Sequence, residues 1–201
     1  MEIARGAEAV VTVDGDVAKE RIAKRYRVPE LDQRLRAERT KTEARLLDAA
    51  RRAGVPVPVV RSVEKHILRM EFIEGSKLRD IFDGMTEEQL RTTARAIGKH
   101  VAALHRNNII HGDLTTSNII VARDNIYFID FGLGKFSSDV EDRATDLHLL
   151  HGAILSTHQA IAKKLWVDIT TGYMENFKGA SAVVKRLHAV ERRGRYSRRV
   201  G

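Results

Sequence analysis

The chain has 201 residues with 35 lysines and arginines, 27 aspartates and glutamates and no cysteine, so its formal net charge at pH 7 is +8. This length suits one large domain or two small lobes with a buried core. The lack of cysteine excludes disulfide frameworks, thiolate zinc sites and cysteine nucleophiles. No stretch approaches the roughly 18 apolar residues of a membrane helix, and the first residues lack the apolar core of a signal peptide. We therefore expect a cytoplasmic protein without a membrane partner.

Most of the positive charge lies at the C-terminal end. Residues 185–201 hold seven lysines and arginines and one glutamate, so they supply +6 of the net charge. Arginine-rich segments bind phosphates, and nucleic acid is the usual partner of this kind. A solubilising tail, or a docking segment for an acidic protein, explains the charge equally well.

The first part of the chain, up to residue 27, has the alternating pattern of a β-meander. Residues 10–13 form a strand candidate, Asp14-Gly15 is typical of a hairpin turn, and a returning strand begins at Val17.

A helix follows, and then a second extended stretch. The helix is expected from about residue 32 to residue 52, because this stretch lacks Gly and Pro and Gly54 follows it as a C-cap. Strands are expected at 59–63 and 67–71, with a polar turn between them. Gly75 then breaks the chain and is the predicted boundary between two lobes.

The part beyond Gly75 begins with a helix. Residues 86–89 match a capping box, and apolar residues then recur at helical spacing on one face: Leu90, Ala94, Ile97, Val101 and Leu104. Short apolar runs at 119–121 and 126–129 follow, with Asp124-Asn125 as a turn between them.

From Asp142 onward the pattern is helical again, with interruptions expected near Gly172 and Gly179. The order of elements predicts an α+β fold in two parts. Residues 1–74 would form a small lobe with a β-sheet and one helix. Residues 75–201 would form a helical lobe that ends in the basic tail.

Two short elements of the second part carry groups that suit phosphoryl transfer. One runs from His111 to Asn118, and the other is Asp130-Phe131-Gly132. Phosphoryl transfer needs a divalent metal to neutralise the phosphates and a carboxylate to orient the attacking hydroxyl or water. Asp113 lies five residues before Asn118 in one loop, and Asp130 completes a set of oxygen ligands that suits magnesium.

Each element alone has an ordinary explanation, since Asp-Phe-Gly is a common turn and a single histidine is more often a packed core residue than an acid or base. Together, their order and spacing resemble the protein-kinase superfamily, whose catalytic loop reads H-R-D-L-x-x-x-x-N and whose metal loop reads D-F-G. This resemblance implies a lysine on the third strand that holds the α and β phosphates, and a helical glutamate that holds the lysine. Lys19 and Glu43 fit these positions.

The resemblance also implies a loop that covers the phosphates and a hinge that meets adenine. Gly6-Ala7-Glu8-Ala9 occupies the place of the loop, with one glycine where most kinases have three. Without the rest, Glu8 and Lys19 would be better explained as solvated surface residues. The hinge would begin at Met70, and the backbone of Glu71 and Ile73 would meet adenine. The apolar walls would be Val11, Val17, Ile120 and Ile129.

The chain departs from signalling kinases in three respects. Its last proline is Pro58, so no Ala-Pro-Glu element follows the metal loop. Only 13 residues lie between Gly132 and Asp146, and we expect Asp146 to anchor the catalytic loop from the next helix. Gly112 replaces the arginine that usually pairs with a phosphate of the activation loop. These departures predict a minimal helical lobe that lacks a full activation segment and works beside a specific partner.

This combination resembles one family over nearly the whole chain: the small atypical kinase/ATPase of the KEOPS complex, the Bud-thirty-two family, which includes p53-related protein kinase. The free-standing length and lack of insertions look archaeal. The matching pieces are Gly6-Ala7-Glu8-Ala9, Lys24-Arg25-Tyr26-Arg27-Val28-Pro29 with Leu31-Asp32, Arg39-Thr40 with Glu43-Ala44, residues 70–75, residues 111–118, residues 129–133, Leu155-Ser156-Thr157-His158, and Arg192-Arg193-Gly194-Arg195 through Val200-Gly201.

The family resemblance implies a bilobal fold with ATP between the lobes. Asp113 would be the base or would orient water, Lys19 would bind phosphates, and Asn118 and Asp130 would bind Mg²⁺. The resemblance also implies autophosphorylation on Ser/Thr and, when the protein is bound to the KEOPS catalytic subunit, ATP hydrolysis that supports threonylcarbamoyl-adenosine modification of tRNA. The helical lobe would meet the KEOPS catalytic subunit, the sheet lobe a small regulatory subunit, and the basic tail tRNA. Ser197 is a conceivable phosphosite, although an ordinary exposed serine explains it better.

Three alternatives compete with this reading. A RIO-type ribosome-biogenesis kinase is also short, but such kinases tend to carry Ser-Glu-Tyr where this chain has Thr115-Thr116-Ser117. Aminoglycoside-type phosphotransferases need a larger helical lobe. A pseudokinase scaffold has no reason to keep the five charged and polar residues of the site: Lys19, Glu43, Asp113, Asn118 and Asp130.

Overall fold

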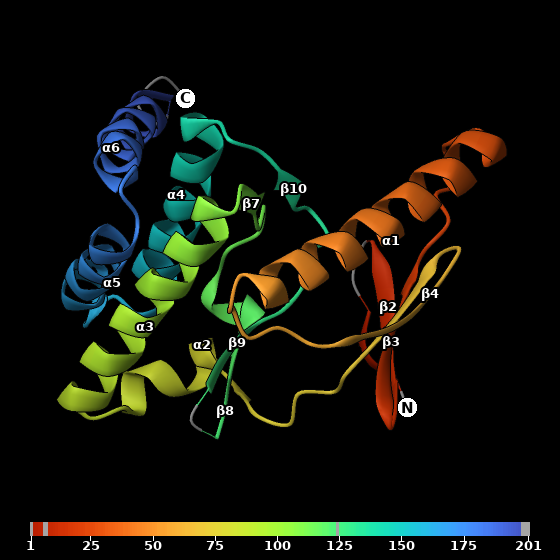
Figure 1. Ribbon diagram of the computed structural model, residues 1–201, viewed down its shortest axis with the longest axis horizontal. Coiled ribbons are helices and arrows are strands. Elements are labelled where there is room, and N and C mark those ends of the chain that lie inside the picture. Colours follow the sequence, from red (N-terminus) through yellow and green to blue (C-terminus); the bar gives the residue numbers. More distant parts are fainter. Residues whose placement is uncertain (1, 6–7, 124, 198–201) are drawn as a thin grey trace.

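An antiparallel sheet of five strands and one long helix form the N-terminal part of the chain in the computed structural model (Figure 1). The structure describes residues 2–5, 8–123 and 125–197, without the side chains of 3–5 and 193–197. The strands follow the spatial order β1-β2-β3-β5-β4, and the helix connects β3 to β4. The elements are β1 (Glu2–Arg5), β2 (Ala9–Asp14), β3 (Asp16–Arg21), α1 (Pro29–Arg52), β4 (Val60–Glu64) and β5 (Ile67–Met70).

The first hairpin and the long helix form where the sequence predicts them. β2 and β3 pair around Gly15, whose φ of +70° is the left-handed conformation that a two-residue hairpin turn requires. α1 begins three residues earlier than expected, because Pro29 is accommodated in the first turn of a helix. Gly54 follows its C-terminal end at φ +79°.

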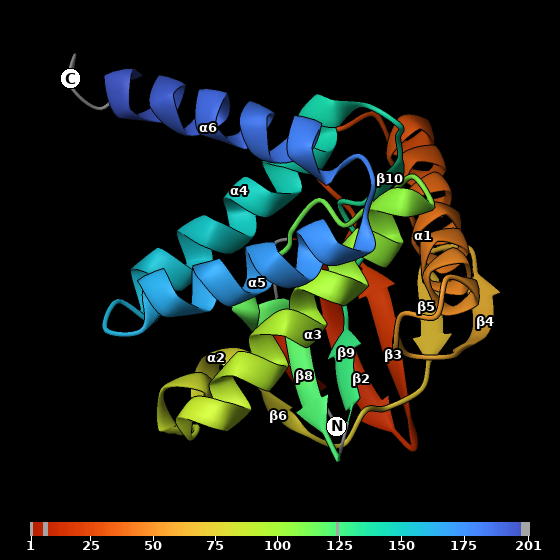
Figure 2. The ribbon, with the colours of Figure 1, turned by 60° about the vertical axis from the view of Figure 1, so that its left-hand side comes forward.

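Beyond this part, the described residues form four longer helices and two small sheets, and Figure 2 shows the helices stacked beside the N-terminal sheet. The strands pair as β6-β8-β9 and β10-β7. The elements are β6 (Ser76–Lys77), α2 (Leu78–Ile81), η1 (Phe82–Gly84), α3 (Glu87–Arg106), β7 (Ile109–Ile110), η2 (Thr116–Asn118), β8 (Ile119–Ala122), β9 (Asn125–Phe128), β10 (Lys135–Phe136), α4 (Val140–Thr157), α5 (Ala162–Asn176) and α6 (Ala180–Ser197).

The predicted capping box and apolar face of α3 are confirmed. The backbone N–H of Gln89 donates to the hydroxyl of Thr86, and the backbone N–H of Thr86 donates to the amide oxygen of Gln89. All five residues expected on the apolar face are buried. The predicted turn at 124–125 is only partly right, since Asn125 already belongs to β9 and Asp124 lies outside the described residues.

The predicted interruption at Gly172 is wrong, whereas the one at Gly179 is confirmed. α5 continues through Gly172, because this glycine lets α3 and α5 approach closely: a Cβ there would lie 2.2 Å from the carbonyl oxygen of Arg95. On the facing helix, a Cβ at Gly98 would lie 2.0 Å from the carbonyl oxygen of Ile169. The two glycines therefore mark the crossing of α3 and α5. From the sequence pattern alone, Gly172 was interpreted as a helix break.

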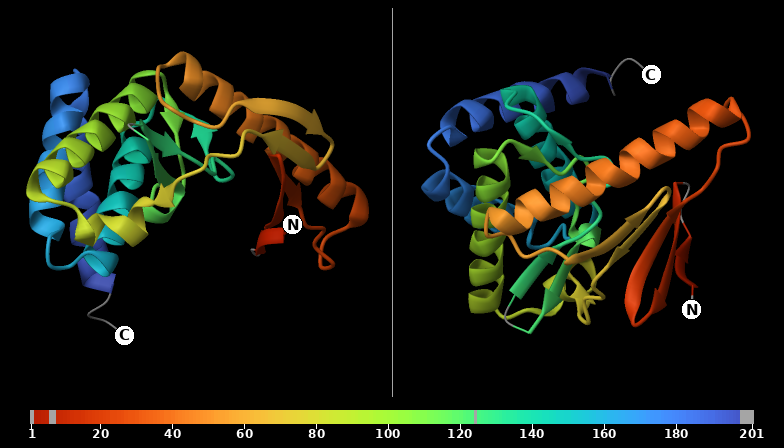
Figure 3. Two further views of the ribbon diagram at one scale, coloured as in Figure 1. Left: turned by 90° about the horizontal axis from the view of Figure 1, so that it is seen from below. Right: turned by 45° about the vertical axis from the view of Figure 1, so that its right-hand side comes forward.

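One hydrophobic core joins the sheet to the helical region. Leu46 and Leu47 of α1 and Leu68 of β5 belong to the same buried cluster as Leu104 of α3 and Tyr173 of α5. Figure 3 shows α1 reaching from the sheet to the helices, which is how this cluster becomes continuous. Within the described ranges, no helix combines the length and the apolar character that crossing a bilayer requires.

We predict that Gly98→Ala destabilises the protein, because its Cβ would clash with the backbone of α5 and overpacking of a core costs about 1–3 kcal/mol. Gly152→Ala is the matched control. Gly152 lies within α4 and has no heavy atom within 4 Å of its Cβ position, so alanine should stabilise that helix by about 0.5–1 kcal/mol. Urea unfolding measures both effects, and equal stability of the two variants would contradict the close approach of the helices.

Candidate active site

A cavity of about 340 Å³ lies between the N-terminal sheet and the helical region. Its apolar lining comes from both sides and includes Val11, Val17, Met70, Ile73, Ile120 and Ile129. Lys19, Asn118 and Asp130 form a polar group along it, and the hinge segment contributes Glu71. The remaining lining residues are Pro58, Phe72, Gly75 and Lys77. Pro58 and Lys77 were not expected here, because neither belongs to a motif.

Lys19 is the centre of the polar group. It lies on β3, it is 7% exposed, and its Nζ is 2.7 Å from Oε1 of Glu43 on α1 and 2.6 Å from Oδ1 of Asp130. Burial alone would lower the pKa of Lys19, but the two carboxylates outweigh burial and hold that pKa above its ordinary value. Likewise, partial burial would raise the pKa of Asp130, but Lys19 holds it below the ordinary value. Lys19 and Asp130 are therefore both charged at neutral pH.

Arg21 is a second buried cation beside Lys19, and the sequence analysis missed it. It follows Lys19 by two residues on β3, so both side chains lie on the same face of the sheet. Its Nη2 is 2.5 Å from Oε2 of Glu43, and the residue is 4% exposed. The sequence contained one signal for Arg21, which is its spacing of two from Lys19. A glutamate that is expected to contact Lys19 is also within reach of a cation on the same face of the strand.

The catalytic-loop segment runs from β7 to η2 and is held by hydrogen bonds. Asn118 donates from its amide nitrogen to the Asp113 carboxylate at 2.9 Å and to the Asp113 carbonyl at 2.8 Å. The expectation that Asp146 anchors this loop is confirmed. Its carboxylate accepts the backbone N–H of His111 at 2.7 Å and of Gly112 at 2.8 Å. Because Asp146 is itself buried on α4, it holds the loop from the side of the protein interior.

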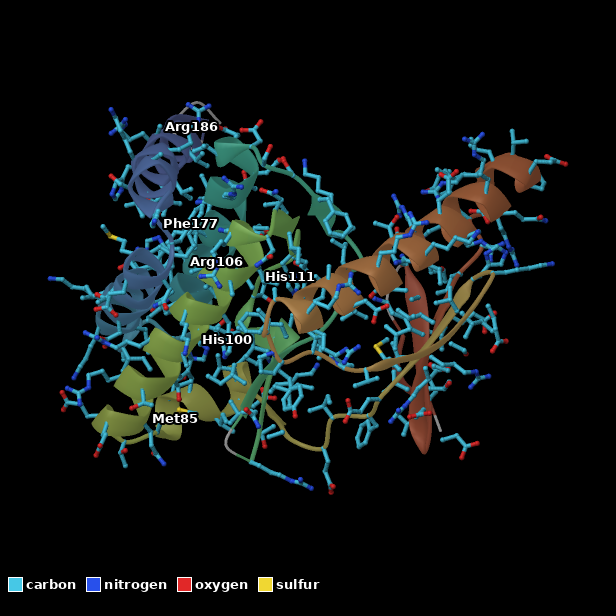
Figure 4. All side chains as sticks on the ribbon, in the orientation of Figure 1. Met85, His100, Arg106, His111, Phe177 and Arg186 are labelled. Atoms are coloured by element: carbon cyan, nitrogen blue, oxygen red, sulfur yellow. The ribbon has the colours of Figure 1, made fainter. Side chains whose placement is uncertain are left out.

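His111 is a buried structural histidine at the centre of the molecule (Figure 4). Its Nδ1 accepts the backbone N–H of Asp113 at 3.3 Å, so Nε2 carries the proton and donates to the carbonyl of Ile129 at 3.1 Å. Burial lowers its pKa despite the nearby carboxylates, which agrees with this neutral form. His111 thereby joins the loop of Asp113 to the residue that precedes Asp130.

Close packing explains the glycine that replaces the usual arginine. Gly112 has a φ of +81°, and a Cβ there would lie 2.2 Å from the carbonyl oxygen of Leu133. The segment after the metal loop therefore rests directly on the backbone of the catalytic loop. Only residues 137–139 separate β10 from α4, so the segment is short, as the residue spacing predicts.

The segment expected to cover phosphates is only partly described. Gly6 and Ala7 lie outside the described residues, and Ala9 is a buried residue of β2. The carboxylate of Glu8 lies 3.0 Å from Nη1 of Arg39 on α1 and 3.5 Å from Nζ of Lys24. Glu8 therefore points toward α1, and neither it nor Ala9 lines the cavity.

Comparison with known proteins identifies the family. Residues 14–134 match the RIO domain model. The chain is 42% identical to the KEOPS complex subunit Bud32 of Pyrococcus abyssi, covering 91% of this chain and 85% of that protein. It is 38% identical to the "Probable serine/threonine-protein kinase BUD32 homolog" of Archaeoglobus fulgidus, covering 100% and 98%. The chain belongs to the Bud32 family. The predicted family is thereby confirmed. The RIO domain that this chain matches is also the domain of the RIO-type kinases considered as an alternative.

Some members of the family are longer. The chain is 47% identical to the "Probable bifunctional tRNA threonylcarbamoyladenosine biosynthesis protein" of Methanocorpusculum labreanum, covering 96% of this chain and 35% of that protein. It thus spans about a third of the length of such bifunctional relatives. Among solved structures, the Rio2 kinase of Chaetomium thermophilum, in an ADP/Mg²⁺-phosphoaspartate complex, matches with a TM-score of 0.66 and 16% identity, over 96% of this chain and 70% of that chain. This match confirms the protein-kinase-like α+β fold.

The buried histidines predict how stability depends on pH. Burial lowers the pKa of both His105 and His111 below the ordinary 6.5. As the pH falls through 6.5, the unfolded chain takes up protons that the folded chain does not, so the free energy of unfolding should decrease by up to about 1.4 kcal/mol per pH unit for each histidine. His111→Gln should reduce this slope, measured by urea unfolding at pH 7, 6 and 5. The exposed His188→Gln is the control, and an unchanged slope in His111→Gln would contradict the neutral buried state.

Proposed function

We propose that the chain is an ATP-dependent serine/threonine kinase-fold ATPase that supports threonylcarbamoyl-adenosine modification of tRNA within a KEOPS complex. The observation that carries this proposal is the position of Lys19, which meets Glu43 and Asp130 at a cavity that Asn118 also lines. The apolar lining suits adenine, and the backbone carbonyl of Glu71, whose N–H already donates to Val59, and the backbone of Ile73 would meet the edge of the base. Lys19 would then hold the α and β phosphates.

The donor set fits a magnesium ion that arrives with the nucleotide. Asp130 offers a half-exposed carboxylate and Asn118 an amide oxygen, and both line the cavity. Among the described residues, no group of three or more histidine or acidic side chains could hold a metal ion alone. Mg²⁺ commonly takes one or two protein ligands and completes its coordination with phosphates and water. When bound, it would neutralise the charge on the phosphates.

The residues of the catalytic loop would then position the acceptor. Asp113 would accept the proton of a serine or threonine hydroxyl, or orient a water molecule, for attack on the γ-phosphate. Asn118 holds the Asp113 carboxylate and Asp146 holds the loop backbone, so this base is oriented before any acceptor arrives. His111 is neutral and already uses both ring nitrogens, so it is not the base.

The names of the relatives support the proposed assembly. A relative that this chain covers to 85% of its length is called a KEOPS complex subunit, and others are called tRNA threonylcarbamoyladenosine biosynthesis proteins. We assign the helical lobe, 75–201, to contact with the catalytic subunit and the sheet lobe, 1–74, to contact with a small regulatory subunit. The basic end of α6 would meet tRNA. The side chains of Arg195, Ser197, Arg198 and Arg199 lie outside the described residues.

The experiment that tests the proposal follows the γ-phosphate of labelled ATP. It uses the protein alone, then with a KEOPS catalytic subunit, then with that subunit and tRNA, and Asp113→Ala is the control in each condition. Phosphate release that requires both partners would support a coupled ATPase. Efficient transfer to any protein substrate, indifferent to partners, would make the chain a free-standing kinase instead. Nucleotide binding without turnover in any condition would indicate the pseudokinase scaffold.

Asp130→Ala should abolish the effect of magnesium on nucleotide binding. Without this carboxylate the metal loses its charged protein ligand, so the gain in ATP affinity on adding Mg²⁺, about tenfold or more, should disappear. Titration calorimetry with and without Mg²⁺ measures this gain. Asp80→Ala, which removes an exposed carboxylate of α2, is the matched control. A gain that survives in Asp130→Ala would rule out Asp130 as a metal ligand.

The double variant Arg195→Ala/Arg198→Ala should bind tRNA more weakly and with a smaller salt dependence. Each lost phosphate contact lowers the slope of log K against log salt concentration by about one. Arg51→Ala/Arg52→Ala removes the same charge from the exposed end of α1 and serves as the control. Filter binding across a salt series gives both slopes. If the tail variant keeps the wild-type slope, the tail is a protein-docking segment.

A further inference from the structure

Arg21 gives the buried glutamate of this site a second cationic partner. The two carboxylate oxygens of Glu43 are divided, since Oε1 lies 2.7 Å from Nζ of Lys19 and Oε2 lies 2.5 Å from Nη2 of Arg21. All three residues are less than a tenth exposed. Removing water strengthens each of these charge interactions, so neither cation is a minor neighbour of the carboxylate.

We propose that Arg21 is a positioning residue of the nucleotide site, which acts through Glu43 and leaves Lys19 with net charge available for a phosphate. The inference rests on the proposed nucleotide-binding function and assigns this arginine a role within it. Arg21 holds Glu43 at the oxygen that Lys19 does not use, so the charge of the carboxylate is shared between two cations.

The charges of the group explain why this matters. In the structure Lys19 is shared by Glu43 and Asp130, so these three groups and Arg21 sum to zero. If Asp130 held a metal ion instead of Lys19, the remaining three groups, Lys19, Glu43 and Arg21, would carry +1. Without Arg21, Lys19 and Glu43 alone would sum to zero. An anionic phosphate is therefore attracted more strongly to this buried group while Arg21 is present.

The position of Arg21 is fixed independently of Glu43. Its backbone N–H donates to the carbonyl of His66 at 3.0 Å, and its carbonyl accepts Nη1 of Arg36 at 3.2 Å. Arg36 is in turn held by the buried Asp32, with 2.6 Å between Nε and the carboxylate. The guanidinium therefore approaches Glu43 from a backbone that the β4–β5 turn and α1 both hold in place.

Arg21 also reaches the metal loop. A Cβ at Gly132 would lie 3.5 Å from Nη2 of Arg21 and 3.1 Å from Nζ of Lys19. In a kinase with a long activation segment, a phosphate on that segment commonly sets the position of the helical glutamate. Here three residues separate β10 from α4, and the second cation on β3 takes over the task of holding Glu43.

The test measures the affinity for a fluorescent ATP analogue, mant-ATP, with Mg²⁺, at a temperature where circular dichroism shows each variant folded. Arg21→Met should weaken binding at least tenfold, and Arg21→Lys should recover most of the loss. Arg69→Met removes an exposed arginine of the neighbouring strand β5 and should leave the affinity unchanged. Arg21→Gln, which keeps a donor but not the charge, replaces Arg21→Met if that variant does not fold.

A double-mutant cycle shows whether Arg21 acts through Glu43. In the Glu43→Gln background, Arg21→Met should change the affinity less than threefold. An equal loss in both backgrounds would mean that Arg21 acts on the phosphates directly and would overturn the positioning role. Unchanged affinity in Arg21→Met, with the wild type binding normally, would overturn the inference alone. If the wild type does not bind mant-ATP, the proposed function fails, and this inference fails with it.

Discussion

The buried carboxylate of Glu43 is the constraint on which the rest of the structure depends. A lone charge in a protein interior costs several kcal/mol unless it is paired, and here one carboxylate is paired with two cations from a single strand. The pairing fixes the position of α1 along its own axis and its rotation about that axis, both relative to the sheet. The core beneath α1, with Leu46 and Leu47 fully buried, holds the helix there. Charge and packing thus determine the same arrangement.

The second half of the site is fixed mainly through backbone contacts. Asp146 accepts two backbone N–H groups of the catalytic loop, and His111 ties that loop to Ile129, the residue before Asp130. Gly112 allows the segment after the metal loop to lie directly on the catalytic loop. The loops that carry Asp113 and Asp130 are therefore held by hydrogen bonds to the backbone and by close contacts, while the side chain of Lys19 is held by ion pairs, one of them to Asp130 itself. The cavity lies where these two kinds of support meet.

The sequence predicts those features that local rules or spaced motifs encode. The β2–β3 hairpin, the capping box of α3 and the Lys19–Glu43 contact belong to this group, because a turn dipeptide, a side-chain pair three residues apart and a family motif each carry their own signal. Arg21 was missed because no motif marks it, and only its spacing of two from Lys19 indicated that it would also reach Glu43. Gly172 was misread because helix breaking and helix crossing require the same residue, and only the neighbouring helix distinguishes them. The direction of Glu8 depends on Arg39, 31 residues away.

The continuous core has a consequence for how a ligand enters and leaves. Rotating the whole sheet away from the helical region would expose the cluster that includes Leu46, Leu68 and Phe131 to water, at about 25 cal/mol for each Å² of apolar surface. Among the described side chains, none from β1 or β2 belongs to that cluster, although Val11 of β2 lines the cavity. A displacement of β1 and β2 that bends their ladder with β3 would therefore expose less of the core than a rotation of the whole sheet.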